Sequence, residues 1–345
     1  MKSYNYNPEY NKIYENLSYK NVKLLEGKYI FLTGGAGFIG SWFLDFFSFL
    51  NKEVLKTPCN ILCAEHNSNI QQTDFIKTIK LDLAKPFDDD HFKKWKFDFI
   101  IHLAGISSPQ EYSKFPLETL DLSYLGTKNV LELARKHKVK SILCFSSAAV
   151  YGNPEPNNVL IDEEHVGAIS PFSDRSSYTI GKKVLETLCH FYHTQFDVPI
   201  KIVRPFNIYG PRMGKSNVIK IFIDKILKKQ PIMIYGDGQQ ARSFCYITDA
   251  INGFLRVLFQ GKSGHAYNIG SSNAEKNMIE LTDLLFEISN RSVNIKMIKY
   301  PDNYPKNEPK RCLPNILKAN KEIGYFNSVS LEEGAALLIS SETQA

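Results

Sequence analysis

Residues 31–41 read FLTGGAGFIGS and place Gly34, Gly37 and Gly40 directly after a short apolar run. That run has the length of a buried strand, and residues 39–52 after it have the apolar spacing of a helix. Glycine permits the tight turn between them and lets backbone N–H groups approach a pyrophosphate at the start of the helix. The stretch therefore predicts the dinucleotide-binding turn of a βαβ unit.

The same alternation of short apolar runs and longer helical segments continues to about residue 207. The further strands predicted from it are 60–66, 75–83, 97–105, 141–147 and 200–207, with long helices over 117–138 and 177–196. Strands that alternate with helices of this length form right-handed βαβ units. The sequence therefore predicts an α/β fold with a Rossmann-like, doubly wound parallel sheet.

Five ranges describe the expected domain organisation. Residues 1–27 are polar and rich in tyrosine, and we expect an extension that packs on the surface or on a partner. The dinucleotide-binding domain is expected over 28–207, with residues from about 240–270 packing back on it. A smaller C-terminal lobe that binds substrate is expected mainly over 208–335, and 336–345 form a tail.

Composition limits the class of protein. The 42 basic and 36 acidic side chains are scattered through the chain and give a net charge of +6, which favours an anionic small molecule over nucleic acid. The six cysteines form no CxxC pair, which favours a reducing compartment. No signal-peptide pattern or run of 18 apolar residues occurs, so we expect a cytoplasmic protein without a membrane span. His190 and His193 lack a third ligand nearby, and no metal site is predicted.

Acidic residues follow the second and third predicted strands. Glu65 is placed to accept hydrogen bonds from an adenosine ribose and to repel a 2′-phosphate, and no arginine follows it at His66, Asn67 or Ser68. NAD is therefore favoured over NADP, with an exposed loop carboxylate as the alternative role for Glu65. Asp82 is placed to reach the adenine, with a helix N-cap as its alternative role.

Tyr178 and Lys182 lie one helical turn apart and project from the same helix face. A nearby ammonium group favours the phenolate and so lowers a tyrosine pKa that is ordinarily near 10. Ser147 ends the fifth predicted strand, 31 residues earlier, on the ligand-binding edge of the sheet. The hydroxyl, the phenol and the ammonium group are therefore predicted to converge on one reacting alcohol or ketone. A core tyrosine beside a surface lysine is the alternative.

Taken together, these segments resemble the extended short-chain dehydrogenase/reductase family that modifies nucleotide sugars. The further motifs that carry the resemblance are HLAG (102–105), SSAAVYG (146–152), SYTIGK (177–182), RPFNIYGPR (204–212) and GDGQQARSF (236–244). The resemblance implies an alcohol–ketone interconversion, usually at carbon 4 of a hexose carried on a nucleoside diphosphate. It also implies a homodimer formed by pairing the helices over 117–138 and 177–196.

The resemblance also implies roles for individual residues. Tyr178 would act as the base, Ser147 would hydrogen-bond the sugar oxygen, and Lys182 would bind the nicotinamide ribose. The implied cofactor contacts are Gly34, Gly37, Phe38, Ile39, Gly40, Glu65, Asp82, Leu83, Leu103, Ala104, Gly105, Tyr178, Lys182 and Pro205. The implied substrate contacts are Ser107, Ser147, Asn207, Arg242 and Arg311.

Some positions depart from the family pattern. Ser123 stands where asparagine is usual, and Arg311 lies four residues before Asn315 where the family has an arginine three residues before an aspartate. For Arg242, an ion pair within the protein is the alternative to a phosphate contact.

Ala148 and Ala149 follow the catalytic serine, and neither side chain can transfer a proton. The 4,6-dehydratases of the family carry an Asp-Glu pair there, and the UDP-glucuronate decarboxylases carry a glutamate. The alanines therefore favour an NAD-dependent 4-epimerase, with a 4-keto-sugar reductase or dehydrogenase as the first alternative. A dehydratase or decarboxylase with a carboxylate supplied from elsewhere is the second alternative, and a non-catalytic dinucleotide sensor is the third.

Overall fold

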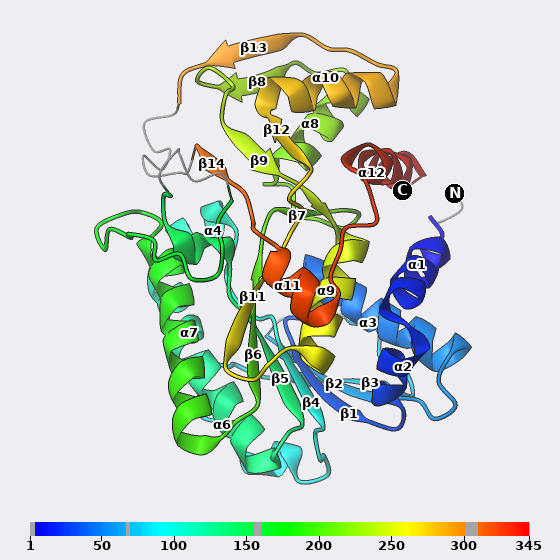
Figure 1. The fold of residues 1–345 in the computed structure, drawn as a ribbon, viewed down its shortest axis with the longest axis vertical. Coiled ribbons are helices and arrows are strands. Elements are labelled where there is room, and N and C mark those ends of the chain that lie inside the picture. Colours follow the sequence, from blue (N-terminus) through cyan, green and yellow to red (C-terminus); the bar gives the residue numbers. More distant parts are fainter. Residues whose placement is uncertain (1–3, 67–69, 155–159, 301–309, 345) are drawn as a thin grey trace.

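The computed structural model describes residues 4–66, 70–154, 160–300 and 310–344, so Asn67 and Ser68, which entered the prediction of NAD, lie outside it. At its centre is a seven-stranded parallel sheet with the order β11-β6-β5-β4-β1-β2-β3 (Figure 1). This order confirms the predicted Rossmann-like sheet. The strands are β1 (Tyr29–Thr33), β2 (Asn60–Glu65), β3 (Ile76–Lys80), β4 (Phe99–His102), β5 (Ser141–Phe145), β6 (Ile200–Pro205) and β11 (His265–Ile269).

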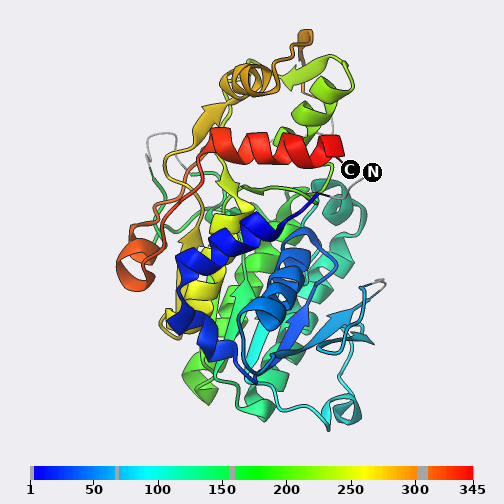
Figure 2. The ribbon, with the colours of Figure 1, turned by 90° about the vertical axis from the view of Figure 1, so that its right-hand side faces the viewer.

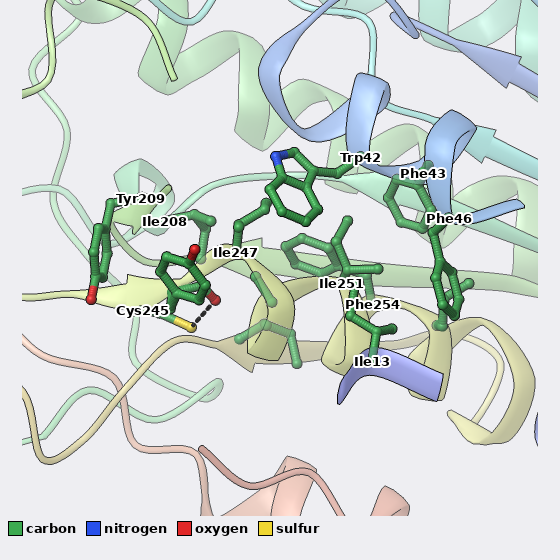
Figure 3. Packing of buried hydrophobic residues seen from close by; sticks show 14 of the residues in the cluster. Ile13, Trp42, Phe43, Phe46, Ile208, Tyr209, Cys245, Ile247, Ile251 and Phe254 are labelled. Carbon is green, nitrogen blue, oxygen red and sulfur yellow. Dashed lines mark hydrogen bonds between the residues drawn. The ribbon is translucent and has the colours of Figure 1, made fainter. Parts of the chain in front are cut away.

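Helices cover both faces of the sheet (Figure 1). On one face lie α3 (Phe38–Glu53) and α9 (Ile247–Gln260), and on the other lie α6 (Thr127–His137) and α7 (Ser176–Phe196). In the core on the first face, Trp42, Phe43 and Phe46 of α3 pack with Ile251 and Phe254 of α9 (Figure 3). These side chains are completely buried, so the two helices are fixed against the sheet.

The helix predicted over 117–138 is interrupted near its middle. It consists of α5 (Pro116–Asp121), a π-helical turn over Leu122–Gly126, and α6. The turn packs against α7, where a Cβ added at Gly181 would lie 2.7 Å from the Ser123 hydroxyl oxygen. Such turns carry one extra residue and are frequent at functional sites.

The first residues of the chain form part of the main core. The helix α1 (Asn7–Leu17), the short helix α2 (Tyr19–Val22) and a 3-10 turn (Lys23–Leu25) follow one another directly. Ile13, Leu17, Val22 and Leu25 are buried in the same hydrophobic cluster as α3 and α9. The segment predicted as an extension therefore packs against its own chain, because its few apolar side chains gather on one side.

The same N-terminal segment connects the sheet domain to the C-terminal part of the chain. Figure 2 shows α1 lying between α3 and the C-terminal helix α12 (Leu331–Gln344). The Asn16 backbone oxygen accepts a hydrogen bond from Arg256 of α9, while the Asn16 side chain donates one to Ser328, 2.9 Å away. Lys12 forms an ion pair with Glu333 at 2.7 Å. Hydrogen bonds and an ion pair thus connect the N-terminal helix both to the sheet domain and to the C-terminal part of the chain.

A smaller lobe lies beyond the carboxyl ends of the sheet strands (Figure 1). The helix α12 packs against α10 (Met278–Ser289) with Leu338 buried, so the predicted tail forms most of a helix of this lobe. The lobe contains β7 (Ile208–Tyr209), α8 (Val218–Leu227), β8 (Ile232–Tyr235), β9 (Ala241–Ser243), β10 (Cys245–Tyr246), β12 (Glu275–Asn277), α10 (Met278–Ser289), β13 (Ile295–Ile298) and β14 (Arg311–Cys312). Four short elements remain: a 3-10 turn (Asp89–Phe92), α4 (Pro109–Lys114), a 3-10 turn (Ala148–Tyr151) and α11 (Leu317–Ile323). None of the helices in the described ranges has the length and hydrophobicity needed to cross a bilayer.

Candidate active site

A cavity of about 1020 Å³ lies at the carboxyl ends of the central strands. Every residue that the resemblance implies as a cofactor contact lines it, and so do Ser107, Ser147 and Asn207. The position agrees with the general rule that parallel sheets bind ligands at the carboxyl ends of their strands. The structure thus brings to one site predicted residues at the carboxyl ends of β1 to β6 and on α3 and α7.

Two positions of the glycine turn, Gly34 and Gly40, leave no room for a side chain. Gly34 has φ +76°, and a Cβ there would lie 2.9 Å from the backbone nitrogen of Ala104. A Cβ on Gly40 would lie 2.1 Å from the carbonyl oxygen of Gly34. Gly37 is the N-cap of α3, so the first backbone N–H groups of that helix are available to an anion. This cradle fits the pyrophosphate of a dinucleotide.

Substituting Gly40 by alanine is expected to lower NAD affinity at least 100-fold and to cost about 3 kcal/mol of unfolding free energy, because the methyl group collides with the Gly34 carbonyl. Calorimetric titration with NAD and thermal unfolding would measure both effects. Gly37→Ala is the control for stability, since its methyl group would lie 3.3 Å from the same oxygen. Unchanged NAD binding in Gly40→Ala would contradict the assignment of the cradle.

Two carboxylates that were predicted to contact the adenosine line the cavity. Glu65 accepts a hydrogen bond at 3.0 Å from the backbone N–H of Ala36 and still lines the cavity, where it suits a ribose diol. Asp82 accepts a hydrogen bond at 3.1 Å from the backbone N–H of Ala84 and lies 3.6 Å from the Lys85 ammonium group. Asp82 therefore stabilises its own turn and also lines the cavity.

His102 is buried at the end of β4, beneath the cofactor cavity. Its Nδ1 lies 2.9 Å from the Thr33 hydroxyl and its Nε2 lies 3.2 Å from the Thr127 hydroxyl. Thr33 in turn accepts a hydrogen bond from the backbone N–H of Ala104, which lines the cavity. Burial, with a smaller contribution from Lys182, lowers the pKa of His102 to about 3. The neutral imidazole therefore connects the end of β1 to the start of α6.

The free energy of unfolding of His102→Gln is expected to be about 1–3 kcal/mol lower than that of the wild type at pH 8. The folded-state pKa of His102, about 3, lies below the unfolded value of 6.5, so the wild-type stability from this group falls as the pH drops from 6.5 toward 3. The difference between the two proteins should therefore shrink over that range, as measured by thermal unfolding. The exposed His190→Gln is the control. A difference that widens toward low pH would contradict this account.

Ser147, Tyr178 and Lys182 meet where β5 ends and α7 begins. The Ser147 hydroxyl accepts a hydrogen bond at 3.1 Å from the backbone N–H of Ala149 and is hydrogen-bonded to Tyr178. The Lys182 ammonium group donates to the backbone oxygen of Phe145 at 2.7 Å and lies 6.0 Å from the centre of the Tyr178 ring. The three side chains that were predicted to converge therefore line one end of the cavity.

Burial and three neighbouring residues act on the pKa of Tyr178. Burial raises this pKa, the hydrogen bond from Ser147 lowers it, Tyr112 raises it, and the charge of Arg175 lowers it. Burial also lowers the pKa of Lys182 to about 8. Ser147 and Arg175 therefore both favour the phenolate, and the influence of Lys182 that the YxxxK spacing predicts stays a prediction.

Sequence reasoning missed two of the neighbours of Tyr178. Tyr112, on α4, is buried and stacks on the Tyr178 ring with the ring centres 5.3 Å apart and the planes within 8°. No local pattern connects these two residues, which lie 66 positions apart. Arg175 could have been found, because it lies three positions before Tyr178 and so on the same side of the helix.

A second cavity of about 370 Å³ adjoins Tyr178 on the other side. Ser147 and Asn207 line both cavities, and Ala148 and Ala149 line this one. Over the described residues, no aspartate or glutamate lines the second cavity. The two positions that follow Ser147 therefore present only methyl groups to this space.

The two arginines predicted to contact phosphate lie in different places. Arg242 lines the second cavity, and its guanidinium group donates to the backbone oxygens of Ala241 and Lys310 at 2.8 and 3.3 Å. Arg311 lines neither cavity and instead forms a bidentate ion pair with Glu275 at 2.6 and 2.8 Å. The carboxylate satisfies the planar fork of Arg311, and the phosphate contact of this residue stays a prediction.

Comparison with known families shows to which of them the chain belongs. The model of the NAD dependent epimerase/dehydratase family matches residues 30–270. The chain belongs to this family. Membership confirms the predicted resemblance, the prediction of an enzyme and the prediction of NAD as the cofactor.

Individual members of the epimerase/dehydratase family resemble the chain over most of its length. UDP-glucuronic acid decarboxylase 5 of Arabidopsis thaliana is 33% identical over 322 residues, which cover 90% of this chain and 87% of the relative. The structure of an epimerase from Methanothermobacter thermautotrophicus superposes with a TM-score of 0.79 at 27% identity, covering 94% and 95%. The structure of UDP-glucuronic acid 4-epimerase from Bacillus cereus, in complex with UDP-glucuronic acid and NAD, superposes with a TM-score of 0.78 at 25% identity, covering 92% and 99%.

Proposed function

We propose that the protein is an NAD-dependent 4-epimerase of a nucleoside diphosphate sugar. One observation carries the proposal: the hydrogen-bonded pair of Ser147 and Tyr178 borders a sugar-sized cavity in which no described residue supplies a carboxylic acid. Oxidation and reduction at a ring carbon need only a base, a hydrogen-bond donor and a hydride carrier. Elimination of water across neighbouring carbons needs a further acid and base.

The side chains supply the proton transfers of this reaction. NAD, held by the glycine turn, Glu65 and Lys182, would supply reversible hydride transfer at carbon 4. The Tyr178 phenolate takes the proton of the carbon 4 hydroxyl as the hydride leaves, and Ser147 hydrogen-bonds the same oxygen. Tyr178 returns the proton in the second half of the reaction. Substrate and product are isomers, and no cofactor is consumed.

A UDP-glucuronic acid decarboxylase is the second candidate, because the relative described above carries that activity. Loss of carbon dioxide from a 4-keto hexuronic acid leaves a carbanion at carbon 5, which must then be protonated. In the UDP-glucuronate decarboxylases of the family that the sequence resembles, a glutamate follows the serine that corresponds to Ser147. Here Ala148 and Ala149 take those positions and line the cavity, which favours the epimerase over the decarboxylase.

The test is to incubate the NAD-loaded protein with UDP-glucose, UDP-galactose, UDP-glucuronic acid and UDP-galacturonic acid, and to follow the products by NMR. The proposal expects a mixture of carbon 4 epimers and no net change in NADH absorbance. Release of carbon dioxide and a UDP-pentose would establish the decarboxylase in its place. Stoichiometric formation or consumption of NADH would establish a dehydrogenase or a reductase.

We also propose that the chain forms a homodimer through the helices over 117–138 and 177–196. Leu117, Tyr124 and Phe191 on these helices are 71%, 44% and 50% exposed, an apolar surface that a second copy would cover. Sedimentation equilibrium of the wild type at micromolar concentration should give twice the mass of one chain.

A further inference from the structure

Arg212 connects the smaller lobe to the helix that follows the glycine turn. It lies between β7 and α8, and its guanidinium carbon is 5.0 Å from the centre of the Tyr6 ring and 4.8 Å from that of Trp42. The same guanidinium group forms an ion pair with Asp45. Trp42 and Asp45 belong to α3, whereas Tyr6 is the N-cap residue of α1. Three parts of the chain that are far apart in sequence therefore meet around one side chain.

Further contacts join the same three parts. The Trp42 indole N–H donates to the backbone oxygen of Pro211 at 3.1 Å. The Tyr10 hydroxyl donates to Asp45 at 3.2 Å, and its ring lies edge-on to Trp42 with the ring centres 5.6 Å apart. Trp42 and Tyr10 are buried, and the attraction between a cation and an aromatic ring is stronger where water is excluded. The chain around Arg212 is therefore held from both α1 and α3.

The backbone of the segment 207–217, to which Arg212 belongs, has an unusual conformation. Arg212 has φ +71° and Asn207 has φ +39°, although both carry a side chain, and Gly210 between them has φ +154°. Residues with a side chain adopt such left-handed conformations at a cost in free energy, and they keep them where surrounding contacts enforce them. We therefore expect the segment 207–217 to relax when the contacts of Arg212 are removed.

Both ends of the segment 207–217 reach the candidate active site. Asn207 lines both cavities, and the resemblance implies it as a substrate contact. Asn217, the N-cap residue of α8, lines the larger cavity together with Ile208. Relaxation of the segment would therefore move groups that face the sugar nucleotide, whereas the glycine turn at the start of α3 would stay in place.

We propose that Arg212 is a positioning residue for the sugar nucleotide, and that the N-terminal segment raises the affinity for this ligand by holding Arg212. The inference rests on the proposed function, because it takes a sugar nucleotide as the ligand of the two cavities. Arg212 lines neither cavity, so it acts through Asn207 and Asn217. Tyr6 and Tyr10 act in turn through Arg212. None of these residues takes part in the transfer of the proton or the hydride.

The first readout is hydrogen exchange of the backbone amides over 207–217 in the NAD-loaded protein, followed by mass spectrometry. Arg212→Ala and Tyr6→Ala should each speed this exchange at least 10-fold and leave exchange in β1 and β2 unchanged. Arg212→Lys, which keeps the charge beside Asp45 but not the flat group between the rings, should have a smaller effect. Tyr14→Ala is the matched control, since it removes another partly buried ring of α1, about 12 Å further along the helix.

The second readout is the affinity of the NAD-loaded protein for UDP-glucose and for UDP-glucuronic acid, measured by calorimetry. Arg212→Ala and Tyr6→Ala should weaken the binding of whichever ligand the wild type prefers by about 10-fold. The reason is that only a fraction of the molecules would then hold the segment 207–217 in the conformation that binds. The affinity for NAD itself should change less than about twofold, and Tyr14→Ala should bind both ligands as the wild type does.

Unchanged exchange over 207–217 in both alanine variants would overturn the proposal, and so would faster exchange with unaltered sugar-nucleotide affinity. An equal loss of affinity for NAD and for the sugar nucleotide would also overturn it, because the contacts of Arg212 would then support the fold as a whole. Neither readout depends on the reaction. Faster exchange with a selective loss of sugar-nucleotide affinity supports the proposal even if the products are carbon dioxide and a UDP-pentose, so a failure of the epimerase is distinguishable from a failure of this inference.

Discussion

Replacing Tyr178 by phenylalanine is expected to lower kcat by about 10³-fold and to leave NAD binding unchanged. The substitution removes the one oxygen that takes the proton from the sugar hydroxyl, a role that contributes about 10²- to 10⁴-fold in enzymes. The ring itself remains, so the stack on Tyr112 and the shape of the cavity are preserved. Turnover would be measured by NMR of the sugar nucleotide, and bound NAD by its absorbance after release.

The control for Tyr178→Phe is Tyr19→Phe, which changes an exposed tyrosine on α2 in the same way. It should retain wild-type turnover. If Tyr178→Phe kept more than a tenth of the wild-type kcat, another group would have to move the proton, and the proposed role of Tyr178 would be wrong.

Deleting residues 1–25 is expected to abolish cooperative folding. The segment buries Ile13, Leu17, Val22 and Leu25 completely. Each such side chain contributes about 1.5–3 kcal/mol, so the four together are comparable to the whole stability of a typical domain, about 5–15 kcal/mol. Thermal unfolding followed by circular dichroism should show no sharp transition. The apolar side chains between α3 and α9 would be exposed to water, and we expect the protein to aggregate.

A single substitution tests the same segment more gently. Ile13→Ala should destabilise the protein by about 2–5 kcal/mol, the usual range for removing a large buried aliphatic side chain. Leu24→Ala, at a position that is 46% exposed in the same segment, should cost far less. Equal unfolding temperatures for the deletion and the full chain would show that the N-terminal helices are dispensable.

The sheet domain could be predicted because each of its signals is local. A glycine turn between a strand and a helix, and strands that alternate with helices, leave few topologies open. The role of residues 1–25 could not be predicted in this way. Tyr10, Ile13 and Leu17 share one face of α1, but the tyrosine-rich composition hid this spacing, and α9, on which they pack, lies more than 230 residues away.

The candidate site also contains residues that could be predicted from local signals and residues that could not. The glycines, Glu65, Ser147 and Tyr178 follow from motifs at strand ends, and the structure brings them to one cavity. The contacts of Arg311 depend instead on the pairing of three short strands, which places Glu275 beside it. Which partner an arginine finds is decided by tertiary contacts, and a single sequence contains no local signal for them.

The π-helical turn over Leu122–Gly126 has a consequence for anyone who aligns or redesigns this chain. One additional residue advances an α-helix by roughly 100°, so the side of α6 that meets the sheet is offset from the side that would be extrapolated from α5. Because the wider turn absorbs this residue, removing a single residue here would convert the turn into ordinary α-helix and keep Val130 and Ala134 on the side that faces the core. Comparisons across this point must therefore allow a one-residue gap inside a helix, where gaps are normally penalised.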